Sequence, residues 1–501
     1  MTDLAFADVA QLRALLGSGE VSAREVTADL VARIERLDPT LHSVIQVNPR
    51  AVEEADDAQG GTGPLAGVPV LVKDNIDTAA PLHTTAGSLA LREGFAAADA
   101  PLVRAIRDAG GVILGKANLS EWANYRSSAS TSGWSAVGGL TANPHDLARS
   151  AGGSSSGSGA AVAAGLAPLA VGTETDGSIS CPASLNGVVG VKPTVGLVPR
   201  TGVVPIAFSQ DTAGPMARSV ADAALLLEVL AFADAADAMT ARDGRPREVS
   251  YMAAARPGRL DGLRVGLPRK ALFGYHVGMD AVVQRAVDQL ADLGAEIVDD
   301  VALPGLDSLG DAEFTVLDHE LKDGLRRYLA TRPDGARSLA DLVAFNREHA
   351  DEELAWFGQE IFERAERTTG LDAQEYCEAR ARCVQAATDE GIDAALREHA
   401  LDALAMPSYS PAWVSDLVLG DKILGGCSTL PALAGYPLIS VPCGSVPGPM
   451  APLPVGLALT ATAWSEPVLL RIAAAYEAVA VPTPRPTGLD AQQLVVPPAS
   501  R

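Results

Sequence analysis

The chain has 501 residues, with 39 Lys and Arg against 62 Asp and Glu, and a formal net charge of −23. Hydrophobic residues make up 48% of the sequence and charged residues 20%, a balance that excludes an intrinsically disordered or fibrous protein. Such an acidic protein repels phosphate backbones and anionic lipid headgroups, so we expect neither a direct nucleic-acid partner nor a membrane partner.

The first sixty residues predict helices, because their apolar residues recur every three to four positions. From residue 67 the pattern changes to short apolar runs that end in polar residues. VPVLVKDN (68–75) and GVILGKAN (111–118) predict two buried strands, each with a lysine and an asparagine at its carboxyl end, and a helix is predicted between them. Strands that alternate with helices indicate an α/β sheet covered on both faces.

The alternation resumes after an irregular polar segment at 232–258, with later strands predicted at LRVGLP, LDALAMP, LISVPCG and PVGLALTATA. Residues 311–400 are highly charged and have a helical period, which predicts a helical insertion over one face of the sheet. A last amphipathic helix is expected at 467–479. We therefore expect a single domain, residues 1–481, and a Pro-rich tail at 482–501.

The five cysteines are odd in number and lie far apart, which is typical of reduced thiols and not of a disulfide framework. The N-terminal segment carries acidic residues where a signal peptide needs positive charge. The longest nearly apolar stretch, 160–172, is too short to cross a bilayer and contains a proline. These features predict a cytoplasmic protein.

The densest motif is RSAGGSSSGSGAAVAAG (149–165), followed at once by PLAVGTETDGSISCPAS (168–184). A flexible linker has such a composition, but this segment runs directly into apolar residues. A phosphate-binding loop needs Gly-Lys-Ser/Thr where its helix begins, and no lysine is present there. Residues 153–157 also match the nucleophile elbow of α/β-hydrolases, with Ser155 as the nucleophile. That elbow follows a strand, and NPHDLARSAGG does not have the pattern of one.

The seven histidines are dispersed, and no pair of them has the spacing of metal ligands. We therefore expect neither a metal ion nor an organic cofactor. Cys181 lies among apolar residues, so we expect a buried structural thiol at this position and not a reactive thiolate.

Several segments together resemble the amidase signature family of serine amidases. They are GGSSSGSG and TDGSISCP, which place Ser154 and Ser178 24 residues apart, with VLVKDN, KANLSEWA, FSQDTAGPMARSVADAALLL and LAGYPLISVPCG. The resemblance covers nearly the whole chain and implies that family's fold, a large mixed β-sheet with helices on both faces (α/β/α). Within the family, SEWAN, GWSA, GTETDGSI and FSQDT are most similar to the subgroup that removes the C-terminal amide of peptides.

The resemblance also implies a role for each site residue. Ser178 is expected to be the nucleophile that forms an acyl-enzyme, Ser154 the bridging serine held by a cis peptide bond, and Lys73 the general base. Ser155 and Thr173 are expected to support them. The candidates for the oxyanion hole are the backbone N–H groups of Thr175, Asp176, Gly177 and Ser178.

A lysine can act as a base only when it is neutral, and its reference pKa is about 10.4. Burial lowers the pKa of an amine because the charged form loses its hydration. Lys73 ends the apolar run 68–72, so we expect it to lie in surroundings of low dielectric constant. The alternative is a lysine that reaches solvent from the end of its strand.

The predicted function is hydrolysis of a carboxamide, either a peptide C-terminal amide or an amino-acid amide, by a monomer or homodimer. Two alternatives remain open: a glutamine-hydrolysing subunit of a tRNA-dependent amidotransferase, and a catalytically inactive binding protein with the same fold. Asp176 and Ser180 stand where many family members have glycine and arginine, and both agree with the peptide-amide subgroup. Candidate pocket residues are the segment 317–357, Trp122, Asn124 and Trp413.

Overall fold

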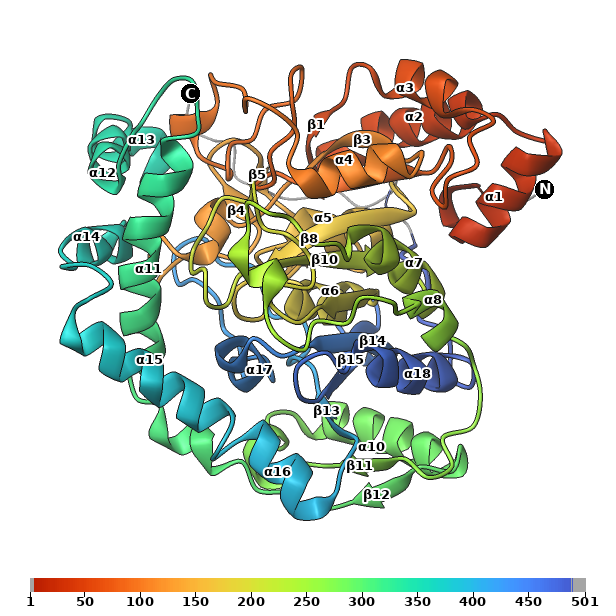
Figure 1. Cartoon of the computed structure of the whole chain (residues 1–501). Coiled ribbons are helices and arrows are strands. Elements are labelled where there is room, and N and C mark those ends of the chain that lie inside the picture. The colour runs from red at the N-terminus through yellow and green to blue at the C-terminus, as the bar shows by residue number, and fades with distance from the viewer. Residues whose placement is uncertain (1–3, 488, 490–501) are drawn as a thin grey trace.

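The computed structural model describes residues 4–487 and 489. An eleven-stranded mixed β-sheet forms its centre, with helices on both faces (Figure 1), so the predicted fold class is confirmed. Across the sheet the strands are β1 (Val44–Val47), β3 (Val112–Ala117), β2 (Pro69–Lys73), β8 (Leu169–Glu174), β10 (Thr212–Ala217), β9 (Val189–Lys192), β14 (Leu438–Val446), β15 (Leu453–Thr460), β13 (Ala403–Pro407), β11 (Arg264–Gly266) and β12 (Glu296–Val298).

Strand β2 shows how the two faces of the sheet are filled. Val70 and Val72 belong to the apolar cluster on one face, and Leu71 belongs to the cluster on the other. Because side chains alternate along a strand, Lys73 lies on the same face as Leu71. The first face is covered by α4 (Pro101–Asp108), α7 (Val220–Leu230), α8 (Tyr251–Ala254), α10 (Val277–Asp292) and α18 (Glu466–Glu477). The second face is covered by α2 (Ala23–Leu41), α3 (Ala51–Ala58), α5 (Ser156–Ala163), α15 (Gln374–Ala387), α16 (Ile392–His399) and α17 (Thr429–Ala434).

Several strands lie where the sequence predicted none, and two of them, β1 and β7 (Asp146–Ser150), lie in segments that were expected to have no strand. β1 interrupts the N-terminal helices and pairs antiparallel with β3 at the edge of the sheet. β7 pairs with β6 (Ala142–Asn143) in a separate two-stranded ribbon, within the segment that lacked a strand pattern. Both are short and carry polar residues, so they lack the continuous apolar run that marks the interior strands. A second ribbon joins β4 (Trp134–Ser135) to β5 (Gly139–Leu140).

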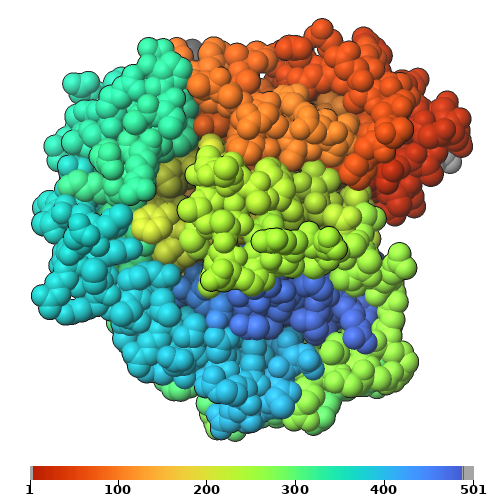
Figure 2. Space-filling view, viewed as in Figure 1, coloured from red at the N-terminus to blue at the C-terminus, as the bar shows by residue number. Residues whose placement is uncertain are grey.

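The helical insertion consists of α11 (Ala312–Leu329), α12 (Leu339–Glu348), α13 (Ala350–Glu353), α14 (Glu360–Glu366), α15 and α16. Its first part does not cover a sheet face as predicted. α11, α12 and α14 share an apolar cluster with the loop residues Trp122, Tyr125 and Ile206. α15 and α16 belong to the apolar cluster on the second face of the sheet, to which α11 adds Val316. Figure 1 shows α11, α15 and α16 as an arc along one side of the molecule, and Figure 2 shows the same segment (teal to cyan) closing that side.

The end of the chain packs on the body of the protein. Of the predicted tail at 482–501, residues 482–487 and Leu489 are described, and the rest lies outside the described residues. The Arg485 guanidinium lies 4.4 Å from the ring centroid of Phe6, and Leu489 is buried. Within the described part of the chain, no helix is long and apolar enough to cross a bilayer.

A buried ion pair lies in the loops beneath the helical insertion, and one of its members contacts the insertion. Nε of Arg126 lies 2.9 Å from Oε1 of Glu121, and neither side chain reaches solvent. The guanidinium also lies 4.5 Å from the ring centroid of Phe357, a residue of the insertion. Glu353 of α13 accepts hydrogen bonds from the Ser88 hydroxyl (2.9 Å) and the Leu89 N–H (2.6 Å). Packing and buried charge therefore hold the insertion in place.

Arg126→Leu is expected to lower the free energy of unfolding by about 3–5 kcal/mol, because it leaves Glu121 buried without its charged partner. The matched control is Arg347→Ala, which removes an exposed ion pair between α12 and Glu363 of α14. Its expected cost is at most about 1 kcal/mol. Denaturant unfolding of both variants tests this, and equal losses would contradict the role given to the buried pair.

Candidate active site

Two parallel strands bring the candidate residues to one edge of the sheet. Lys73 ends β2, and Thr173 lies near the end of β8, with Val72 paired to Val171. The carboxyl ends of parallel strands meet at the same edge. The Gly/Ser segment packs against this edge and leads into α5, which is entirely buried, so the linker interpretation is wrong. The Gly153–Ser154 peptide bond is cis.

Uncharged acceptors surround the amine of Lys73. Nζ lies 2.8 Å from Oγ of Ser154, 2.8 Å from Oγ1 of Thr173, 3.0 Å from Oγ of Ser155 and 3.3 Å from the Thr173 carbonyl oxygen. Lys73 has no exposed surface, so the solvent-reaching alternative is wrong. Burial lowers the pKa of Lys73 well below its ordinary value of 10.5, although the more distant carboxylates of Glu174 and Asp211 oppose this.

Two other lysines are fully buried, and both have different neighbours. Lys116 donates to the Ile76 carbonyl (2.6 Å) and to the hydroxyls of Thr78 and Thr84 (both 3.1 Å), and it lies 3.6 Å from the Asp74 carboxylate. Lys192 donates to the carbonyl of Tyr436 (2.5 Å), and burial lowers its pKa to about 8. The nearby carboxylate favours the charged form of Lys116, and the carbonyl that accepts from Lys192 has no hydrogen to give. Lys73 has hydroxyl neighbours and, among the described residues, no ion-pair partner, so it is the buried lysine that is placed to take a proton from a neighbour.

The hydrogen bonds of Ser155 limit what it can do. Its hydroxyl donates to the Thr173 carbonyl (3.0 Å), and its oxygen accepts from the Thr173 N–H (3.2 Å). Its hydrogen is therefore already used, and Ser155 can only accept from Lys73. Ser155 is also fully buried, which does not fit a nucleophile elbow. Among the described bonds, the Ser154 hydroxyl has no partner besides Lys73, so its hydrogen is free to be donated to a neutral amine.

Four consecutive backbone donors near Ser178 have no acceptor. The Glu174 carboxylate accepts hydrogen bonds from the N–H groups of Ile179 (2.7 Å) and Ser180 (2.8 Å), where α6 (Ser180–Asn186) begins. The N–H groups just before them donate to no acceptor in the part of the chain that the structure describes; these belong to Thr175, Asp176, Gly177 and Ser178. Unpaired donors in one turn are what an oxyanion hole requires.

The turn depends on glycine at position 177. Gly177 has φ +81°, in the left-handed region, and a Cβ there would lie 1.9 Å from the Tyr409 hydroxyl oxygen. A side chain at position 177 would therefore obstruct the turn.

Ser178 lies at a cavity of about 370 Å³. Ser178 is 6% exposed, and its hydroxyl makes no hydrogen bond to another described residue, Ser154 included. However, the Ser155 N–H donates to the Ser178 carbonyl (3.0 Å), and this bond joins the Gly/Ser segment to the turn that carries Ser178. Among the residues that line the cavity are Asn124, Gly153, Thr175, Asp176, Cys181, Glu313, Phe314, Leu317 and Tyr409.

The predicted pocket residues are only partly right. Asn124 and Leu317 line the cavity. Trp122 instead packs edge-on against Phe362, and Trp413 donates from Nε1 to Asp421 (2.9 Å). Cys181 does line the cavity, but burial raises the pKa of its thiol, as expected for an unreactive cysteine.

Sequence reasoning missed the two carboxyl groups of the cavity, those of Glu313 and Asp176. Glu313 lies in the first turn of α11 and accepts a hydrogen bond from Nε2 of Gln210 (3.0 Å). Burial raises the pKa of both carboxyl groups, and that of Glu313 lies well above its ordinary range. Each carboxyl group also shifts the pKa of the other. No sequence signal marks Glu313, because a glutamate in a highly charged helix is typical of a solvated face.

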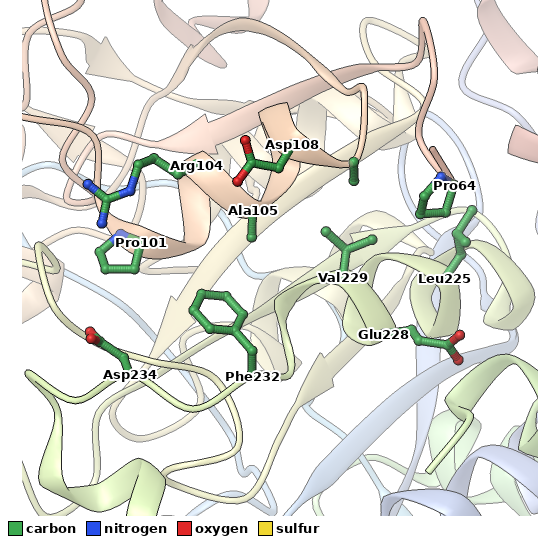
Figure 3. Close-up of a pocket in the computed structure, with 11 residues that line it drawn as sticks. Pro64, Pro101, Arg104, Ala105, Asp108, Leu225, Glu228, Val229, Phe232 and Asp234 are labelled. Carbon is green, nitrogen blue, oxygen red and sulfur yellow. The ribbon is translucent and has the colours of Figure 1, made fainter. Parts of the chain in front are cut away.

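A larger cavity, of about 610 Å³, lies away from the catalytic candidates, between α4 and α7 (Figure 3). Arg104 and Asp108 border it on one side, and Glu228 and Phe232 on the other. None of the candidate catalytic residues contributes to it. Among residues 4–487 and 489, no three His, Cys, Asp or Glu side chains are grouped as a metal ion would require.

Comparison with known proteins identifies the family. The family model named Amidase matches residues 25–470. The structure is similar to peptide amidase from Stenotrophomonas maltophilia, with 48% identity and a TM-score of 0.91 over 97% of this chain and 99% of that one. The sequence is 36% identical to a probable amidase of Arabidopsis thaliana, over 94% of this chain and 89% of that protein. It is 38% identical to a glutamyl-tRNA(Gln) amidotransferase subunit of Symbiobacterium thermophilum, over 94% of this chain and 96% of that protein.

The fold and these matches define an amide hydrolase. The chain belongs to the amidase signature family, as its motifs predicted.

Gly177→Ala is expected to lower amide hydrolysis by about 100-fold or more, since the turn must move away from Tyr409 and its N–H groups lose their alignment. Gly258→Ala is the matched control, because a Cβ at Gly258 meets nothing within 4 Å. It should leave activity and melting temperature unchanged. Steady-state ammonia release tests both, and a fully active Gly177→Ala variant would exclude this turn from catalysis.

Proposed function

We propose that the protein hydrolyses the carboxamide of a peptide C-terminal amide or an amino-acid amide to the carboxylic acid and ammonia. The observation that carries the proposal is the fully buried amine of Lys73, which is surrounded by hydroxyls and bonded to Ser154, the residue after Gly153 in the lining of the cavity that contains Ser178. The 48% identity to a protein named peptide amidase supports this substrate class.

In the proposed mechanism, the Ser178 oxygen attacks the carboxamide carbon while its proton passes through the Ser154 hydroxyl to neutral Lys73. The carbonyl oxygen becomes an oxyanion, and the free N–H groups of residues 175–178 stabilise it. The proton then returns through Ser154 to the leaving nitrogen, and ammonia departs from an acyl-enzyme. Water attacks the acyl carbon by the same proton route, which releases the acid and restores Ser178.

The hydrogen bond between Ser154 and Ser178 has to form when substrate enters the cavity. Catalytic hydrogen bonds are often long before substrate binds and tighten only in the complex. Ser155 and Thr173 have the role of holding the amine, so that its lone pair faces Ser154.

The similarity to a protein named as a glutamyl-tRNA(Gln) amidotransferase component favours a second candidate function, glutamine hydrolysis for a partner that uses the ammonia. Ammonia release from glutamine, and not from peptide amides, would support this candidate. A catalytically inactive binding protein would release no ammonia and would not react with a fluorophosphonate probe. A cytoplasmic location and a monomeric or homodimeric state remain predictions.

Ser178→Ala is expected to reduce ammonia release from a peptide amide by at least about 1,000-fold and to abolish fluorophosphonate labelling, because the attacking oxygen is lost. The matched control is Ser158→Ala in α5. The Ser158 hydroxyl donates to the Val171 carbonyl and does not contact Lys73. This variant should retain activity. Labelling that persists in Ser178→Ala would place the nucleophile elsewhere.

The lowered pKa of Lys73 also predicts how stability depends on pH. Between the folded-state pKa and the ordinary value of 10.5, the unfolded chain binds more protons at this site, so the wild type gains stability as pH rises through that window. Lys73→Met lacks this contribution. The free energy of unfolding of the wild type should therefore rise relative to that of Lys73→Met as pH increases toward 10.5. A constant difference between the two denaturation series would mean that Lys73 is charged in the folded protein.

A further inference from the structure

Two carboxyl groups from distant parts of the chain face the catalytic cavity together. Asp176 lies two residues before Ser178 in the turn after β8, and Glu313 lies in the first turn of α11. Both line the cavity that contains Ser178. The proposed chemistry uses the backbone N–H of Asp176 and neither carboxyl group, so the pair has no role in the mechanism given above.

The hydrogen bonds show which of the two carries the negative charge. Ser428 and Thr429 donate their hydroxyl hydrogens to Asp176. Because the hydrogen of Ser428 is used on Asp176, the Tyr409 hydroxyl donates to the Ser428 oxygen (2.6 Å). The Asp176 carboxylate is thus the final acceptor in a chain of hydrogen bonds, and these bonds stabilise its ionised form. Glu313 has the Gln210 amide as its donor, and burial raises its pKa well above the ordinary range. Glu313 therefore holds the proton and Asp176 the charge.

A separate observation fixes where a ligand lies relative to this pair. The Ser178 hydroxyl is unpartnered among the described residues, more than nine-tenths buried and open to the same cavity. A carboxamide whose carbon contacts this hydroxyl has its oxygen at the free N–H groups of residues 175–178. The next atoms of the ligand, the α-carbon and its substituents, then lie in the cavity beside Asp176. Phe314 and Leu317 line the same cavity with apolar surface.

We propose that Asp176 and Glu313 form a specificity subsite for an N–H donor on the carbon next to the scissile carboxamide. That donor is the amide N–H of a peptide amide or the ammonium group of an amino-acid amide. The inference rests on the proposed function and narrows it, because it selects carboxamides with an α-nitrogen over aliphatic amides. An aliphatic amide would displace water from the Asp176 carboxylate without adding a donor in its place, which costs binding free energy.

The test uses three amides with the same phenyl group: N-acetylphenylalaninamide, phenylalaninamide and 3-phenylpropanamide, which lacks the α-nitrogen. The wild type is expected to hydrolyse the first two with kcat/KM at least tenfold above the third. Glu313→Leu should reduce that ratio at least tenfold, while Glu313→Gln, which keeps a donor toward Asp176 and a carbonyl oxygen, should retain it within about threefold. Thr315→Ala, at a partly exposed position of the same helix that does not line the cavity, is the matched control and should leave the ratio unchanged.

The outcomes separate this inference from the proposed function. If the wild type releases ammonia from none of the three amides, the proposed function fails. If it hydrolyses all three equally well, or if Glu313→Leu slows all three in parallel, the chemistry stands and the subsite is refuted. Should Glu313→Leu not fold, Asp176→Asn provides the second variant: it neutralises the pair and should reduce kcat/KM for phenylalaninamide more than for 3-phenylpropanamide. Equal loss for these two substrates would refute the subsite as well.

Discussion

An amine buried beside hydroxyl groups, with no carboxylate in contact with it, is the constraint on which the active site depends. A charged lysine in such a place would lose its hydration without gaining an ion pair, and the folded state favours the neutral form instead. The burial follows from the fold, because β2 runs between β3 and β8 and ends beneath the loop that precedes α5. Burial at the end of its strand favours the neutral form of Lys73, which is the form that can accept a proton.

Different parts of the structure hold different residues of the candidate active site. The core of the sheet and the buried helices α5 and α6 hold the amine, the serines and the turn with free N–H groups. Glu174 satisfies the first donors of α6 and leaves the preceding four unpaired. The helical insertion adds Glu313, Phe314 and Leu317 to the cavity wall. In the proposed mechanism the chemistry depends on the sheet, and in the proposed subsite the choice of substrate depends on a segment that packs over its edge.

Sequence reasoning could predict the features that depend on continuous apolar runs and on motif resemblance. The run before Lys73 correctly predicted a buried strand and a buried lysine, and the resemblance to the amidase signature family was confirmed. The short polar strands β1 and β7 were missed because their pairing, and not their composition, defines them. Glu313 could not be found, since tertiary packing of α11 brings it to the cavity beside the Asp176 turn. The roles of Ser154 and Ser178 remain predictions that activity measurements have to test.

The chain has only six lysines, which makes the protonation state of Lys73 directly measurable. NMR of protein labelled with ¹³C at the lysine ε-carbons gives one signal for each lysine, and substitution of Lys73 assigns its own. We expect this signal to have the chemical shift of a neutral amine at pH 7.5, while solvent-exposed lysines show that of an ammonium group. A Lys73 signal that remained that of an ammonium group up to pH 10 would mean that Lys73 is charged in the folded protein and is not the base.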